Sequence, residues 1–151
     1  MRSKKYWLMK SEPESYSIDT LKADKKTAWT GVRNFQARNF MRDDMQIGDG
    51  VLFYHSSCKV PGVYGLAKVV STPYPDPTQF DTKSHYHEPR ATKEKPVWYL
   101  VDIALVKKLK EPVTLSKIRA VPKLRSMTIL KPGSRLSITP VSSEEFEVFK
   151  P

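Results

Sequence analysis

The apolar residues of this chain fall into short runs, some with the pattern of strands and others with the 3.6-residue period of helices. This mixture limits the possible fold more than any other feature. Runs typical of strands cover residues 5–10, 51–54, 63–70, 97–106 and 135–141. Helical spacing is found in residues 17–22, 34–44 and 142–149, with shorter helical or irregular pieces at 114–120 and 122–130. Strands and helices do not alternate regularly, as they do in a doubly wound parallel sheet. We therefore expect an α+β fold with a mixed, mostly antiparallel, barrel-like sheet and short flanking helices.

Several residues indicate where these elements begin or bend. Ser17 and Asn34 are expected N-caps, because their side chains can accept hydrogen bonds from unpaired backbone N–H groups. Ser142, with Glu145 three residues later, has the pattern of a capping box. Gly65 interrupts an apolar run and predicts a bulge or a close approach of another group. Residues 6–9 are apolar without alternation, which predicts a strand that is buried on both faces.

The segment from residue 72 to residue 96 contains five prolines, at positions 73, 75, 77, 89 and 96. Proline lacks a backbone N–H and has a fixed φ, so we expect no regular secondary structure here. Long loops in compact domains are usually functional or mobile. This segment is therefore a candidate part of a functional site.

The size and composition of the chain limit its environment. A length of 151 residues fits one domain covering residues 1–151. No apolar run reaches the about 18 residues of a membrane span, and charged residues interrupt the segment that follows the basic N-terminus, unlike a signal peptide. Cys58 is the only cysteine, so the chain cannot form an internal disulfide. These features predict an intracellular protein that does not contact a membrane.

The net charge of +10 favours polyanionic partners through counterion release. Two segments are basic and contain no acidic residue. The first, residues 1–11, contains Arg2, Lys4, Lys5 and Lys10, and the second, residues 114–142, contains Lys117, Arg119, Lys123, Arg125, Lys131 and Arg135. They would form one positive face if they met in space. An ordinary solvated surface is the alternative explanation of this charge pattern.

Metal binding and catalysis are weakly supported by the sequence. The candidate metal ligands are His55, Cys58, His85 and His87, but there is no paired Cys-x-x-Cys, and two of these histidines fall in the proline-rich segment. Neither a nucleophile elbow nor a phosphate-binding glycine loop is present. We expect no metal, no cofactor and no catalytic residue.

Aromatic residues next to basic and amide residues indicate a base-binding pocket. They occur in residues 29–34, beginning with Trp29, and in residues 53–56. Aromatic side chains stack on bases, and amide or imidazole groups can read base edges. The alternative is that these aromatic residues belong to the core. Alternation along a strand puts Phe53 and Tyr54 on opposite faces, and we assign Phe53 to the core.

The ordered motifs of the chain resemble those of the EVE domain family. They are WLMKSEP at 7–13, WxGVRNFQARNF at 29–40, GDxVLFYHS at 48–56, PGVxGLA at 61–67, YPDPTQFD at 74–81, PxW at 96–98 with VD at 101–102, and LSIxPV at 136–141, where x marks a position outside the motif. The resemblance covers almost the whole chain and implies a PUA-like fold, the superfamily that also contains the YTH readers of methylated adenine. It implies a reader of modified bases, with modified cytosine in DNA as the favoured ligand. Lys68 and residues 84–88 depart from the family pattern, and no second cage Trp is evident there.

The resemblance to the YTH readers matches their Lys-Ser with Lys10 and Ser11, their first cage Trp with Trp29, and their strand-end segment with residues 53–56. On this basis the expected pocket has Trp29 as stacking residue and Tyr54 as a side wall. Ser11, Asn34 and His55 would read polar edges, and Lys10 and Arg33 would meet a phosphate or a base carbonyl. The expected outer phosphate contacts are Arg38, Arg42, Lys117, Arg119, Lys123 and Arg125, and residues 74–80 would close over the ligand.

The expected partner is therefore DNA or RNA that carries a modified base, bound by a monomer. The expected location is the cytoplasm if the source is bacterial and the nucleus if it is eukaryotic. Two alternatives stay open: an enzyme that acts on modified bases or nucleotides, and a protein-interaction scaffold with a vestigial pocket.

Overall fold

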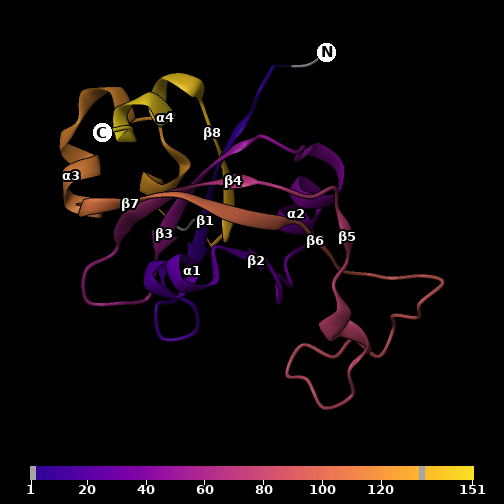
Figure 1. Cartoon of the computed structure of the whole chain (residues 1–151). Coiled ribbons are helices and arrows are strands. Elements are labelled where there is room, and N and C mark those ends of the chain that lie inside the picture. The colour runs from indigo at the N-terminus through magenta and orange to yellow at the C-terminus, as the bar shows by residue number, and fades with distance from the viewer. Residues whose placement is uncertain (1–2, 133–134) are drawn as a thin grey trace.

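A curled six-stranded sheet forms the centre of the computed structural model, which describes residues 3–132 and 135–151 (Figure 1). The strands lie in the order β2 (Lys26–Ala28), β7 (Asp102–Thr114), β4 (Gly62–Val69), β3 (Gly50–His55), β1 (Tyr6–Ser11) and β8 (Ile138–Val141). The pair β1 and β3 is parallel, and the other pairs in the sheet are antiparallel. This arrangement confirms the predicted α+β fold with a mixed, mostly antiparallel half-barrel. Arg2 of the basic N-terminal segment lies outside the described residues.

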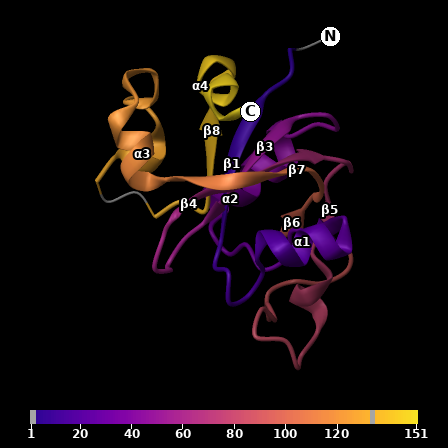
Figure 2. The ribbon, with the colours of Figure 1, turned by 60° about the vertical axis from the view of Figure 1, so that its left-hand side comes forward.

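Both faces of the sheet are buried, as the apolar run in β1 predicts. Trp7 and Met9 pack into one cluster, which we call the first core, and Leu8 packs into the other, which we call the second core. Helix α1 (Ile18–Asp24) and helix α2 (Phe35–Asn39) cover the first core. Helices α3 (Leu115–Ala120) and α4 (Ser143–Phe149) cover the second core, and Figure 2 shows them on the side of the sheet opposite α1.

The predicted helix caps are present. The side chain of Ser17 accepts a hydrogen bond from the backbone N–H of Thr20, and that of Asn34 accepts one from Ala37. Ser142 and Glu145 form the complete capping box of α4. The second helix differs from the expected continuous helix to residue 44. Helix α2 ends at Asn39, and the π-helical turn η1 (Phe40–Asp44) follows. Hydrogen bonds in a π-helix join residues five apart instead of four apart.

The predicted strand at 97–106 is divided in the structure. Its first part is β6 (Tyr99–Leu100), which pairs with β5 (Tyr74–Pro75) in a separate small sheet. The backbone carbonyl of Val101 accepts a hydrogen bond from Trp29 N, so the chain leaves one sheet there and enters the other as β7. Gly65 marks a register shift in β4, and a Cβ at this position would collide with Ile18 Cδ1. Both predicted explanations of this glycine are therefore confirmed.

The proline-rich segment has more structure than predicted. It contains β5 and the 3-10 helix η2 (Pro77–Phe80), and then continues as turns away from the sheet (Figure 1). The fully buried side chain of Gln79 closes the base of this loop. Its Oε1 accepts hydrogen bonds from the backbone N–H groups of Val97 and Trp98, at 2.9 and 2.8 Å, and its Nε2 donates to Trp98 O at 2.7 Å.

The C-terminal part follows the predicted pattern in outline. The irregular pieces after α3 are the 3-10 helices η3 (Pro122–Leu124) and η4 (Thr128–Leu130), and the last strand is shorter than expected, at Ile138–Val141. Within the described residues, every helix is too short or too polar to traverse a lipid bilayer.

Candidate nucleic-acid interface

The parallel pairing of β1 with β3 brings the carboxyl ends of both strands to one edge of the sheet, where Lys10 and Ser11 lie beside Tyr54 and His55. A cleft of about 730 Å³ opens at this edge. Its walls come from β1 and the loop after it, from β2 and the segment after it, and from the loop between β3 and β4. The proline-rich segment of residues 72–96, which we call the long loop, and the segment before β8 complete the walls. The lining residues are Lys10, Ser11, Glu12, Ser15, Tyr16, 27–33, Ser56, Ser57, Tyr86, Arg135 and Ser137.

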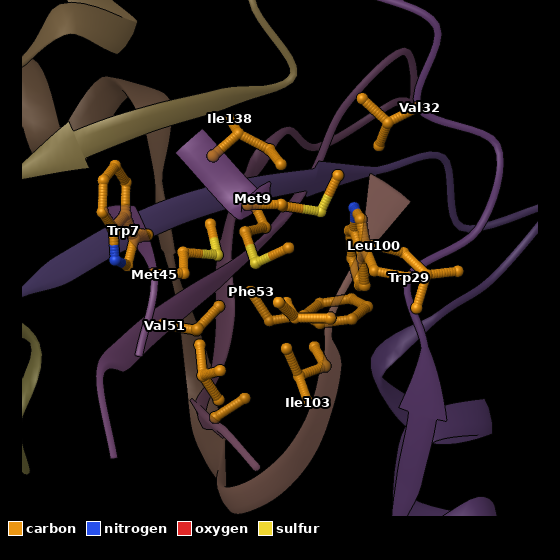
Figure 3. Close-up of a cluster of buried hydrophobic side chains, with 14 of the residues drawn as sticks. Trp7, Met9, Trp29, Val32, Met45, Val51, Phe53, Leu100, Ile103 and Ile138 are labelled. Carbon is orange, nitrogen blue, oxygen red and sulfur yellow. The ribbon is translucent and has the colours of Figure 1, made fainter. Parts of the chain in front are cut away.

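Trp29 lies between the first core and this cleft. Only 8% of its surface is exposed, and its ring meets Phe53 edge to face in the first core (Figure 3). The indole N–H groups of Trp7 and Trp98 are bound by Asp49 and Glu88. In contrast, the indole Nε1 of Trp29 has no hydrogen-bond acceptor in residues 3–132 and 135–151.

The two acid-free basic segments meet at the cleft. The backbone N–H of Lys10 donates to Ser137 O at 2.8 Å, which places the segment before β8 beside the end of β1 and brings Arg135 into the same wall. Neither cationic side chain has an ion-pair partner among the residues described. Burial lowers the pKa of Lys10 below its ordinary value, because a charged ammonium loses hydration there. An anionic or carbonyl group entering the cleft would restore that lost solvation.

Serine and tyrosine side chains make up the polar rim. Ser11 Oγ donates to the carbonyl of Tyr16, and Ser11 O accepts the backbone N–H of Ser56, so two loops are joined at this point. The hydroxyl of Tyr16 donates a hydrogen bond to the Asp24 carboxylate, and the centre of its ring lies 6.5 Å from the ring centre of Phe53. Sequence analysis did not select Tyr16 as a site residue.

Arg33 lines the cleft, but its guanidinium is bound within the protein. Nη1 donates to Val32 O and to Asp76 Oδ2, at 2.9 and 3.2 Å. Nη2 donates to Thr78 Oγ1 and to Tyr86 O, at 3.1 and 2.6 Å. Four of its five N–H groups therefore have protein acceptors, and the expected contact of Arg33 with a phosphate or a base carbonyl stays a prediction.

Three of the expected pocket residues do not line the cleft. Tyr54 packs in the second core with 2% exposure, because the alternation of β3 turns it away from Trp29. His55 is 6% exposed; its Nε2 accepts the backbone N–H of Ile18, which begins α1, and its ring stacks on Tyr64. Asn34 uses its side-chain oxygen to cap α2. The predicted roles of Tyr54 as a wall and of His55 as an edge reader are not compatible with this geometry, while Asn34 lies outside the cleft lining and its role stays a prediction.

The expected outer contacts lie in two places outside the cleft. Arg38 donates to Val97 O and to Asn39, and Arg42 is paired with Asp43. The other four cations, Lys117, Arg119, Lys123 and Arg125, lie in or next to α3 and η3. Leu115 N donates to Pro61 O, so α3 begins beside the β3–β4 loop that also borders the cleft.

The metal and catalytic alternatives gain no support from the arrangement of the described residues. His55 is occupied by Ile18, and no group of three or more metal-ligating side chains comes together in the part of the chain that the structure describes. Cys58 is half-buried and unpaired.

Sequence reasoning missed Tyr86, Arg135 and Asp76. Asp76 is 1% exposed and accepts the backbone N–H of Gly31 at 2.8 Å as well as Arg33, so it joins the long loop to the Trp29 segment. The acid-free segment contained Arg135, and the unusual stretch at 84–88 contained Tyr86, but only the spatial neighbours of both residues reveal the cleft.

The protein is a small α+β domain with a curled sheet. The cleft at one edge of this sheet is cationic and partly aromatic, which suits a polyanionic ligand. Residues 5–149 match the EVE domain, and the chain belongs to this family. Thymocyte nuclear protein 1 of Homo sapiens is 41% identical over 94% of this chain and 71% of its own length. A structure of a Pseudomonas syringae protein is 47% identical, covers 95% of each chain and superposes with a TM-score of 0.90. Human THYN1 in complex with 5-methylcytosine-containing DNA is 39% identical, with a TM-score of 0.88 over 95% of this chain and 94% of that one.

Proposed function

We propose that this chain is a non-enzymatic DNA-binding module that reads a modified base in the cleft, with 5-methylcytosine as the first candidate. The human relative was solved with DNA that contains this base, and it shares the fold along nearly the whole chain. The observation that carries the proposal is the combination, in one cleft, of an aromatic floor with an unused indole N–H and cations without protein partners.

The size and charge of the cleft suit one nucleotide. Its volume of about 730 Å³ falls in the range of roughly 300–1,000 Å³ that encloses small ligands in proteins. Two cationic side chains without an ion-pair partner among the described residues line it, at Lys10 and Arg135, against one carboxylate, at Glu12, while the charge of Arg33 is paired with Asp76. The potential in the cleft therefore favours an anionic group, and its aromatic part favours a base.

The energetic balance favours a base that leaves the duplex at low cost. Extruding a base costs a few kcal/mol, whereas stacking on an aromatic side chain returns about 1–3 kcal/mol per base. A methyl group buried in the cleft adds about 0.8 kcal/mol, or a preference of about fourfold over the unmethylated base. Hydrogen bonds to the base edge would make up the rest.

Each residue in the cleft receives a role from its position. Trp29 forms the floor and offers its Nε1 donor, and Ser11 offers a hydroxyl lone pair. Lys10 contacts a base carbonyl or a phosphate, and Arg135, which is exposed, contacts the backbone. The cations of α3 would contact phosphates further along the same duplex, because α3 begins beside Pro61 of the β3–β4 loop, and this loop borders the cleft at Ser56 and Ser57.

Fluorescence anisotropy with labelled oligonucleotides tests this proposal. The panel contains one 5-methylcytosine, an unmodified cytosine or another modified base, in duplex DNA, single-stranded DNA and RNA. We expect tighter binding to one modified DNA, by at least about fourfold, from the buried methyl group alone. Equal affinity for every member of the panel would contradict base reading.

A binding role is proposed over a catalytic one because Ser11 and His55, which the sequence placed in the pocket, already have structural partners. Ser11 donates to Tyr16 O, and His55 accepts from Ile18. Mass spectrometry of modified nucleotides and oligonucleotides after incubation with the protein should show no change of mass.

A further inference from the structure

The long loop reaches the cleft at Tyr86, and this residue is held more firmly than its place in an irregular segment suggests. Its carbonyl accepts the hydrogen bond from Arg33 Nη2, and the Arg33 guanidinium lies 5.2 Å from the centre of its ring. Its ring lies against Gly31, where a Cβ would come within 2.8 Å of the ring carbons. Gly31 has φ +84°, so a side chain there would be strained for two reasons.

The loop behind Tyr86 is fixed at both ends. Gln79 closes its base through Val97 and Trp98, and Glu88 accepts the indole N–H of Trp98 at 3.0 Å. Because these groups are bound on both sides of Tyr86, the loop presents one ring in one place at the wall of the cleft.

Tyr86 is 40% exposed, although its contacts with Gly31 and Arg33 cover part of it. An aromatic side chain that is fixed at its backbone and still exposed on its ring has little conformational entropy to lose when a ligand stacks on it. The phenol hydroxyl has no hydrogen-bond partner within residues 3–132 and 135–151, and is therefore available to a base edge.

We infer that Tyr86 is the second aromatic wall of the base site, and that Arg33 is a positioning residue which holds Tyr86 in place instead of contacting phosphate. The inference rests on the proposed function and names a recognition residue of that same site. It supplies the aromatic wall that Tyr54, buried on the other face of the sheet, does not provide.

The first experiment compares Tyr86→Ala and Tyr86→Phe with the whole wild-type chain by anisotropy, using the best modified oligonucleotide of the panel. Loss of a stacked aromatic ring predicts binding weaker by about 5- to 150-fold for Tyr86→Ala. Tyr86→Phe keeps the ring and should recover most of that loss. Tyr86 is exposed and in a loop, so both variants should fold, which circular dichroism checks.

A matched pair of arginines tests the role of Arg33. Lysine can replace arginine at a simple phosphate contact, but it cannot make the four hydrogen bonds of the Arg33 fork. We therefore expect Arg33→Lys to lose affinity at an unchanged salt slope, whereas Arg42→Lys, at an exposed arginine outside the cleft, should bind as wild type does. In the Tyr86→Ala background, Arg33→Lys should cost little further affinity, since the ring that Arg33 positions is already absent.

The outcomes are distinguishable. If the wild type shows no preference for any modified oligonucleotide, the proposed function fails. If the wild type has a preference and Tyr86→Ala keeps both affinity and preference, the role of Tyr86 is wrong. If Arg33→Lys and Tyr86→Ala weaken binding independently, with costs that multiply in the double variant, Arg33 does not act through Tyr86. Should Arg33→Lys not fold, the Tyr86 pair alone still decides the first half of the inference.

Discussion

The indole ring of Trp29 meets the phenyl ring of Phe53 edge to face, with ring centres 5.6 Å apart and an interplanar angle of 88°. Phe53 is fully buried, whereas Trp29 lies at the boundary between the first core and the cleft. The same side chain therefore supports the fold and forms the floor of the candidate site. Variants of Trp29 have to separate these two effects.

Trp29→Phe should fold and bind weakly, because a phenyl ring can still contact Phe53 but has no N–H to donate. Trp29→Ala should lose about 3–5 kcal/mol of stability from the cavity it leaves. The measurements are urea unfolding for stability and anisotropy for binding. A Trp29→Phe variant that binds the modified oligonucleotide as tightly as wild type would show that the indole N–H is not used.

The salt dependence of binding should identify the phosphate contacts. Each contacted duplex phosphate contributes a slope of about −0.9 to the plot of log affinity against log salt. We expect Arg135→Gln to reduce the magnitude of the slope by about one contact, and Lys117→Gln with Arg119→Gln to reduce it further. An unchanged slope in the α3 double variant would limit the interface to the cleft.

The free energy of unfolding should fall as the pH falls below about 6.5, because His55 then becomes protonated. Burial lowers the pKa of His55 in the folded state, while nearby Asp19 acts in the opposite direction. The unfolded chain then binds more protons than the folded one, so the contribution of His55 is complete above the ordinary pKa of about 6.5 and is lost on acidification. Protonation of Nε2 would also remove the acceptor of the Ile18 N–H.

Urea unfolding at pH 7.5, 6.5 and 5.5 checks this expectation. Carboxylates with a depressed pKa, such as Glu88 at about 2, act at lower pH and do not interfere. His55→Gln should flatten the dependence in this range. A wild-type free energy of unfolding that stays constant from pH 7.5 to 5.5 would contradict the role of His55.

Asp49 should be among the most sensitive polar positions. It is 2% exposed and accepts the indole N–H of Trp7 and the backbone N–H groups of Lys5 and Gln46. Asp49→Ala leaves these donors without an acceptor and should cost about 2–5 kcal/mol in urea unfolding. The matched control is Asp43→Ala, which breaks an exposed pair with Arg42 and should cost less than about 1 kcal/mol. Equal costs for the two variants would show that Asp49 has no special structural role.

The sequence predicted the helix caps and the buried first strand correctly, because each of these features depends on residues close together in the chain. Ser17, Asn34 and the pair Ser142 and Glu145 cap helices as expected, because a cap depends on only the next three residues. The apolar run of β1 predicted burial on both faces for the same reason. The division of residues 97–106 at Val101 was not predictable, since it depends on a hydrogen bond from Trp29, far away in sequence.

The sequence predicted some of the residues that line the cleft, and their role in binding stays a prediction. Lys10, Ser11, Trp29 and Arg33 do line one cleft, because the family motifs carry these residues. Tyr54 and His55 belong to the same motif in sequence but point elsewhere, since one is turned to the second core and the other serves the start of α1. Tyr86 and Arg135 come from segments without a motif signal, and only tertiary contacts bring them to the cleft.

The parallel pairing of β1 with β3 also determines how well the candidate site tolerates substitutions and insertions. Because β1 and β3 run in the same direction, the loops that follow them leave from one edge and face the ligand together. Both strands are held by cores on either side, so substitutions or insertions in those two loops would alter ligand choice with little effect on folding. This makes the edge a suitable place for laboratory diversification: a library confined to residues 12–15 and 57–60 would search for new ligands and would leave Tyr16, which packs on the first core, unchanged.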